Sequence, residues 1–199
     1  MSTQRGEVTP GWEQPTPLGY GHGAKEAQFV AAPLLAAASL GLAGVVAGAK
    51  DEMFLFSGPT LLVLVLSTMS LIYSIQLAYH ARKFLYSKED VLDWYGHDLT
   101  KRPELFARLR AQQGDDYATW VFYNNKAMAL FNVGTVLLGF GVAAALAPGK
   151  DSGQKIWRWG AAVIVLGCTF YEIYWQRRLR LGVARQARHT GSHAGQGGT

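Results

Sequence analysis

Charged residues are scarce in this 199-residue chain. Only 17% of its residues are Asp, Glu, Lys or Arg, whereas 49% are hydrophobic. A typical soluble domain carries about 25% charged residues. This balance excludes a disordered chain and argues against an ordinary soluble domain. The chain also has a single cysteine, Cys168, which excludes an intramolecular disulfide framework.

The sequence also lacks the short motifs of common enzyme classes. It contains no HExxH, no phosphate-binding glycine loop, no GxSxG and no pair of carboxylates inside an apolar segment. We therefore expect a protein that is not an enzyme and that binds no cofactor and no metal. The alternative is a metal-dependent membrane enzyme that uses Asp93, His97 and Asp98. That set is short of ligands, since a divalent metal usually needs three or four and Gly96 interrupts the helical turn.

Four apolar segments organise the chain, and each is long enough to cross a hydrocarbon core of about 30 Å as a helix. They predict an all-α polytopic membrane protein with a four-helix membrane domain over residues 28–177. A signal peptide ending at Ala47-Gly48-Ala49 is the competing interpretation of the first segment, but the apolar run is too long for one. The predicted transmembrane helices cover residues 29–49, 58–80, 127–147 and 156–176.

The rest of the chain divides into two tails and a central segment. Residues 1–27 are polar and rich in Pro and Gly, which predicts a flexible N-terminal tail. Residues 178–199 begin with arginines and end in Gly, Ser and His, which predicts a basic and then disordered C-terminal tail. Residues 81–125 connect the second and third spans.

The positive charges indicate how the chain is oriented. Fifteen of its nineteen Lys and Arg residues lie in the two tails and the central segment or, as Lys126 and Arg177, directly beside them, and four spans place all of these on one side of the membrane. The positive-inside rule then predicts a multi-pass protein of the plasma membrane with both termini in the cytoplasm. The net charge of +5 thus reports orientation and does not indicate nucleic-acid binding.

The central segment, residues 81–125, predicts short amphipathic helices. Ser87 followed by Glu89 and Asp90 is typical of a helix start, and Gly96 is expected to end that helix. A second helix is expected to begin near Pro103 and to end at Gly114, before a third runs into the membrane. These helices either lie on anionic headgroups or pack under the bundle as a lid, and the sequence leaves both alternatives open.

Arginine and aromatic residues make the predicted contact set, because both are enriched where proteins meet partners and anionic lipid. The expected partners are the lipid bilayer, its anionic lipids and an unidentified membrane or cytoplasmic protein. The residues are Trp94, Arg102, Phe106, Arg108, Arg110, Trp120, Arg177, Arg178 and Arg180.

Four polar residues within or beside the spans form a second candidate set: Gln76, His80, Asn132 and Glu172. By chain direction they all fall toward the cytoplasmic side, where polar groups in hydrocarbon need partners. They predict a polar cluster that faces the cytoplasm in a small oligomeric channel or transporter. The competing interpretation is an interfacial position, which the neighbouring Tyr171, Tyr174 and Trp175 favour.

Small residues along the first span form a packing candidate. Gly41, Gly44 and Gly48 share one face of the helix, and the last two make a GxxxG motif. Such residues let a second helix approach closely. The second helix belongs either to this chain's own bundle or to another copy in a homo-oligomer.

A further indication comes from residues 77–86, where Leu-Ala-Tyr-His-Ala-Arg-Lys-Phe-Leu-Tyr precedes an acidic stretch ending at Trp94. Together with Trp120, Asn132-Val133-Gly134 and Ala147-Pro148, this pattern resembles small four-span integral membrane proteins of actinobacteria. The resemblance covers about residues 60–178 and implies a four-helix membrane architecture. It carries over no catalytic or binding residue.

The function expected from these patterns is that of a non-enzymatic membrane adaptor, scaffold or regulatory component. Its basic cytoplasmic segment is expected to face a protein partner or anionic lipid.

Overall fold

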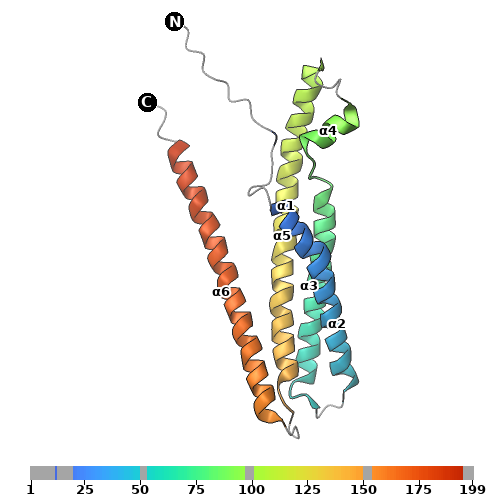
Figure 1. The fold of residues 1–199 in the computed structure, drawn as a ribbon, viewed down its shortest axis with the longest axis vertical. Coiled ribbons are helices and arrows are strands. Elements are labelled where there is room, and N and C mark those ends of the chain that lie inside the picture. Colours follow the sequence, from blue (N-terminus) through green and yellow to red (C-terminus); the bar gives the residue numbers. More distant parts are fainter. Residues whose placement is uncertain (1–11, 13–19, 50–52, 97–100, 150–153, 195–199) are drawn as a thin grey trace. The chain divides into compact units, whose positions relative to one another are not determined.

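The computed structural model describes Trp12 and residues 20–49, 53–96, 101–149 and 154–194, with side chains described from Gly23 to Arg178 within the helices. Most of these residues are helical and none forms a β-strand; one isolated bridge pairs Phe54 with Pro148. The elements are α1 (Tyr20–Glu26), the π-helix η1 (Ala27–Ala31), α2 (Ala32–Gly48), α3 (Ser57–Arg82), α4 (Lys88–Tyr95), α5 (Pro103–Leu146) and α6 (Lys155–Ala194) (Figure 1).

Four helical segments are long and apolar enough to cross a membrane, as the sequence predicts. They cover Gly23–Gly48, Ser57–Arg82, Pro103–Leu146 and Lys155–Arg178. Helix begins at Tyr20, inside the range expected to be a tail, and α6 continues to Ala194, inside the other. The Ala, Leu and Arg residues that follow Arg178 are good helix formers, which explains the continuation.

The first apolar helix contains a π-helical turn just before Pro33. The amide of Ala32 donates to the carbonyl of Ala27, five residues earlier, instead of the usual four. Proline has no amide hydrogen and its ring crowds the carbonyl four residues before it, so the ladder around Phe29 must rearrange. The turn rotates the residues before it relative to α2 and leaves Gln28 buried.

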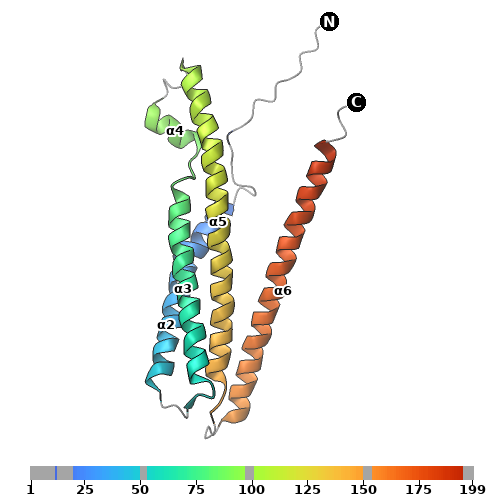
Figure 2. The same ribbon diagram turned by 180° about the vertical axis from the view of Figure 1, so that it is seen from behind.

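α5 is one continuous helix of 44 residues (Figure 2). The expected helix break at Gly114 is therefore wrong, and the second and third short helices of the central segment do not exist as separate elements. A glycine inside a helix costs about 1 kcal/mol relative to alanine. The helix-forming residues on both sides of Gly114, together with the hydrogen bond that Asp116 accepts from the Tyr86 hydroxyl, offset that cost.

The chain divides into two compact units. The first unit comprises residues 1–34 and 71–131, and the second comprises residues 35–70 and 132–199. In the second unit a small apolar core forms around Leu64, which is fully buried among Ala43, Val46 and Ala145. The added Cβ of a side chain at Gly141 would lie 2.5 Å from Leu64 Cδ2, so that glycine permits the approach of α5 to α3.

Hydroxyl groups complete the packing of the second unit. Ser39 Oγ donates to the carbonyl of Leu64 at 2.9 Å, and Ser67 Oγ donates to the carbonyl of Gly134 at 2.8 Å. Both bonds join different helices. Hydroxyls of this kind satisfy their own polarity and hold neighbouring helices in register, which hydrocarbon alone does not do.

α6 contacts α5 at several places in the second unit, of which two show how the helices approach. Gly139 leaves just enough room for the side chain of Thr169, with which an added Cβ would collide. Arg158 donates from Nε to the carbonyl of Leu146 at 3.2 Å and from Nη2 to that of Ala145 at 3.3 Å. The last carbonyls of a helix have no partner inside it, so this arginine caps the C-terminal end of α5.

The glycines expected to pack the bundle do not do so. A Cβ added at Gly41, Gly44 or Gly48 would meet no atom within 4 Å. The close approaches occur at Gly139 and Gly141 instead, because the opposite face of α2, with Ser39, Ala43 and Val46, is the one that turns inward. The glycine face of α2 is therefore open in this chain.

Candidate functional site

α4 starts with a reciprocal capping arrangement. Ser87 Oγ accepts a hydrogen bond from the amide of Asp90 at 3.2 Å, and Asp90 Oδ2 accepts one from the amide of Ser87 at 2.7 Å. Two amides that would lack partners at the start of the helix are thereby satisfied. Gly96 ends the helix with a φ of 77°, a backbone conformation that glycine adopts readily. Both predicted ends of this helix are confirmed.

Tyr86 joins this capped helix to α5. Its hydroxyl donates to Asp116 Oδ2 at 2.7 Å, and its ring lies 5.9 Å from the ring of Trp94 on α4. Burial is the largest cause that raises the pKa of Tyr86 well above its ordinary value, and the hydrogen bond to the Asp116 carboxylate adds to it. Tyr86 therefore keeps its proton across the physiological range and serves as a permanent donor to Asp116.

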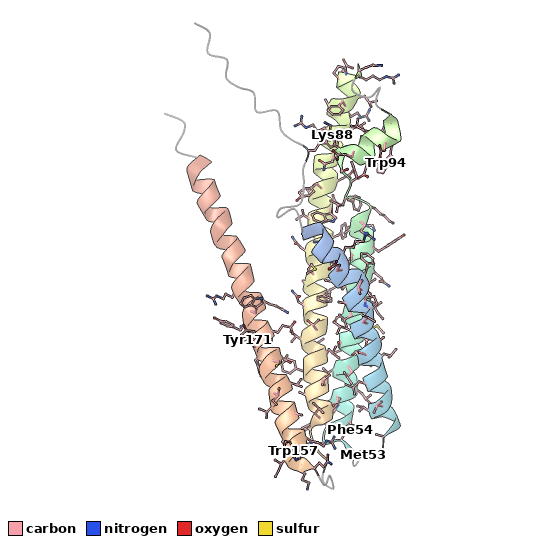
Figure 3. The ribbon with its side chains drawn as sticks, viewed as in Figure 1. Met53, Phe54, Lys88, Trp94, Trp157 and Tyr171 are labelled. Carbon is pink, nitrogen blue, oxygen red and sulfur yellow. The ribbon has the colours of Figure 1, made fainter. Side chains whose placement is uncertain are left out.

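We call α4 together with residues 103–120 of α5 the α4–α5 platform. The predicted contact residues are unevenly exposed on it. Trp94 is 68% exposed and is followed by the exposed Tyr95 (Figure 3). Arg102, next to the platform, and Arg108 are exposed, whereas Arg110 is half-buried. Trp94, Tyr95, Arg102 and Arg108 are thus exposed aromatic and basic side chains on or next to the platform.

Two other predicted contact residues are covered. Trp120 is only 5% exposed, so it does not lie on the open surface where the sequence led us to expect it. Its position on α5 turns it toward the interior of the first unit. Gln113, which lies two helical turns before it on the same face of α5, is buried as well. Phe106 is half-buried and meets the ring of Trp12 edge-on at 5.6 Å.

The predicted arginines on α6 follow its apolar part. Arg177 and Arg178 are exposed, and the side chain of Arg180 lies outside the described residues. His97 and Asp98 also lie outside them. Within the described part of the chain, no three His, Cys, Asp or Glu side chains gather into a group that could hold a metal ion.

Three cations rest on aromatic rings in the first unit, a feature that the sequence analysis missed. Lys126 Nζ lies 4.1 Å from the ring centroid of Phe122, and Lys83 Nζ lies 5.7 Å from that of Tyr79. The guanidinium of Arg82 lies 4.6 Å from the ring of Phe29. None of these cations forms an ion pair with a carboxylate that the structure describes. Aromatic and basic residues combined in this way are typical of a membrane–water interface.

A buried amide pair was also missed. Gln28 Nε2 donates to Asn124 Oδ1 at 3.4 Å, and both side chains are only 3% exposed. Gln28 lies in the π-helical turn, which Pro33 causes five residues later. Pro33 was therefore the one feature of the sequence that could have indicated the position of Gln28. The pair satisfies polar groups that would otherwise be stranded between apolar helices.

The four residues of the predicted polar cluster fall into the two separate units. In the first unit, Gln76 is exposed, and His80 meets the rings of Tyr123 at 4.7 Å and Phe84 at 5.5 Å. His80 thus has one aromatic neighbour just after the end of α3 and one on α5. Asn132 and Glu172 belong to the second unit.

Glu172 has polar partners that the sequence did not indicate. Its Oε1 accepts a hydrogen bond from Thr135 Oγ1 on α5 at 3.0 Å and another from Gln176 Nε2 at 3.0 Å. The side chain of Asn132 is not among these partners; its backbone carbonyl lies 2.9 Å from Thr135 Oγ1. The second unit therefore holds a carboxyl, a hydroxyl and an amide side chain in contact, within otherwise apolar helices.

Comparison with protein-family models, with curated proteins and with solved structures finds no match for this chain. The resemblance to actinobacterial membrane proteins therefore stays a prediction. The four long apolar helices are consistent with the class of multi-pass helical membrane proteins.

Proposed function

We propose that this chain is a non-enzymatic adaptor of the plasma membrane, with both termini in the cytoplasm. In this proposal the α4–α5 platform binds a protein partner through Trp94, Arg102 and Arg108. The observation that carries the proposal is the exposed Trp94 on a capped helix that Tyr86 ties to α5. An exposed tryptophan on a helix that is held in place before binding, with exposed arginines on or next to the same platform, is the composition of an interaction hot spot.

The length of α5 supports a protein partner over a lipid surface. At 1.5 Å per residue its 44 residues extend about 66 Å, more than twice the thickness of a hydrocarbon core of about 30 Å. If residues 127–146 cross the membrane, Arg108 stands about 27 Å beyond Lys126 along the helix. Electrostatic attraction to anionic headgroups fades over a Debye length of about 8 Å at physiological salt. Arg108 would therefore lie beyond the reach of the headgroups.

Other basic residues are better placed for anionic lipid. Lys83 and Lys126 each rest on an aromatic ring, and Arg177 and Arg178 directly follow the apolar part of α6. In this proposal they anchor the bundle at the headgroup level, while the platform beyond them binds the partner.

Site-specific photo-crosslinking in native membranes tests the proposal. A photoreactive residue at position 94 should give a discrete protein adduct, and Arg102→Ala with Arg108→Ala should reduce its yield at least tenfold. The matched control is position 157, because Trp157 is also strongly exposed but lies in the first turn of α6, outside the platform (Figure 3). Lipid adducts alone at position 94, or the same protein adduct at both positions, would refute the platform as a partner site.

A further inference from the structure

Glu172 is the only acidic residue within the four predicted spans. It is partly buried, and its carboxyl contacts Thr135 across the α5–α6 packing and Gln176 one turn further along α6. An ionisable residue inside a membrane helix is costly to charge and commonly marks a functional site.

The contact with Thr135 sets the depth of this carboxyl. Thr135 lies about 14 Å along α5 from Lys126, where the apolar stretch begins, and about 17 Å from Leu146, where the helix ends. This is the middle of a stretch that matches the hydrocarbon core. The sequence of α6 alone suggests a shallower position, since Arg177 follows Glu172 by little more than one turn.

When Glu172 is ionised, the hydroxyl of Thr135 faces two hydrogen-bond acceptors but has only one hydrogen to donate. Thr135 Oγ1 lies 2.9 Å from the carbonyl of Asn132 and 3.0 Å from Glu172 Oε1. A carbonyl and a carboxylate only accept hydrogen bonds, and a hydroxyl has one hydrogen to donate. One of the two contacts therefore lacks a hydrogen. If Glu172 is protonated, it donates to Thr135, which donates to Asn132, and each contact has its hydrogen.

No cation neutralises Glu172 in the described part of the chain. It forms no ion pair with a described Lys, Arg or His, and residues 127–146 of α5, the helix that it contacts, contain no titratable side chain. The nearest titratable and charged residues along α6 itself are Cys168, Tyr171, Tyr174, Arg177 and Arg178, and all five side chains are exposed. Among the described residues, therefore, none balances the negative charge of an ionised Glu172, and binding of a proton would remove that charge.

We propose that Glu172 is a reversible proton-binding site inside the membrane domain, with the hydroxyl of Thr135 as its switching partner. When a proton from water binds, Glu172 donates to Thr135 Oγ1 and the hydroxyl turns to the carbonyl of Asn132. When the proton returns to water, the hydroxyl turns to the carboxylate and the carbonyl loses its extra hydrogen bond. The site does not depend on the α4–α5 platform or on its partner.

Infrared spectroscopy of the full chain in lipid nanodiscs tests the switch directly. Asparagine carrying a ¹³C label in its backbone carbonyl labels Asn124, Asn125 and Asn132, and the band that disappears in Asn132→Gln is the band of Asn132. A pH titration should shift that band as the carbonyl gains or loses the hydrogen bond. Glu172→Gln should remove the pH dependence and hold the band at its protonated position, because the carboxamide donates to Thr135 at every pH.

Two threonine variants separate the switch from general packing. Thr135→Val keeps the side-chain shape but removes the hydroxyl, so the Asn132 band should lose its pH dependence. Thr169→Val is the matched control, because Thr169 bonds only to the carbonyl of Val165 in its own helix, and the shift should persist. A band that does not move with pH in the unmodified chain, or that moves equally in Glu172→Gln, would overturn the proposal. Neither outcome would alter crosslinking at position 94.

Discussion

The two units of this chain are held together by different chemistry. In the first unit, long side chains make the contacts between helices, as between Gln28 and Asn124 and between Tyr86 and Asp116. In the second unit, the side chain of Leu64 packs directly against the backbone at Gly141, and the hydroxyls of Ser39 and Ser67 bond directly to backbone carbonyls.

This difference indicates what each unit can tolerate. Close backbone packing in hydrocarbon depends on shape, so a single added side chain disrupts it. Contacts between long side chains near an interface can be lost one at a time, and water can satisfy part of what remains. The stability of the second unit should therefore depend more on the size of a substituted side chain, and that of the first unit more on the loss of a polar group. Variants in each unit measure this contrast.

The largest effect is expected from Gly141→Leu. The new side chain would collide with Leu64 in the core of the second unit and should destabilise the protein by about 2–3 kcal/mol. Unfolding in detergent micelles, followed by circular dichroism, measures the loss. Gly44→Leu is the control, since the space around Gly44 is open. Equal losses in both variants would contradict close packing at Gly141.

Tyr86→Phe should have a moderate effect on the first unit. The variant keeps the ring against Trp94 and loses only the hydrogen bond to Asp116, which should cost about 1 kcal/mol. The same unfolding assay measures it, with the exposed Tyr95→Phe as the control. If both tyrosine variants match the unmodified chain, Tyr86 does not tie α4 to α5.

The raised pKa of Tyr86 also predicts how stability depends on pH. A folded pKa above the unfolded value of about 10 means that the stabilisation is complete below pH 10. It is lost as the pH rises above that value, because the unfolded chain releases the proton first. Unfolding followed at increasing alkaline pH should show a steeper loss for the unmodified chain than for Tyr86→Phe. Parallel curves would argue against a tyrosine that is held protonated.

A smaller coupling is expected between Gln28 and Asn124. Hydrogen bonds between membrane helices contribute about 0.6 kcal/mol on average. A double-mutant cycle with Gln28→Leu and Asn124→Leu should give a coupling energy near that value, since the two amides bond to each other. Strict additivity of the two variants would show that this contact does not stabilise the π-helical turn.

The smallest effect on monomer stability is expected from Gly44→Ala, which adds one methyl group in open space. We expect a change below about 0.5 kcal/mol. Sedimentation in detergent gives a separate result: a fall in self-association would assign the glycine face to contact between copies. An unchanged monomer–dimer balance would leave that face to lipid.

The sequence predicted those features that depend on local patterns. The four apolar helices follow from runs of uncharged residues, and the start of α4 follows from Ser87 and Asp90 three positions apart. The sequence did not predict that α5 continues through Gly114. The helix propensity of a single glycine does not show whether the helical residues on both sides of it will offset its cost. The contacts of Tyr86 with Asp116, of Glu172 with Thr135 and of Gln28 with Asn124 join residues 30 to 96 positions apart, and no local pattern encodes them.

Cysteine accessibility along α5 tests the central claim, that this helix continues far beyond the membrane as part of the platform. In a Cys168→Ala background, single cysteines from position 104 to 140 are treated with a membrane-impermeant thiol reagent, in membranes whose cytoplasmic face is open. We predict labelling with helical periodicity from position 104, through 114, to about 122, and protection beyond Lys126. Protection that begins before Gly114, or loss of the periodicity there, would contradict the account.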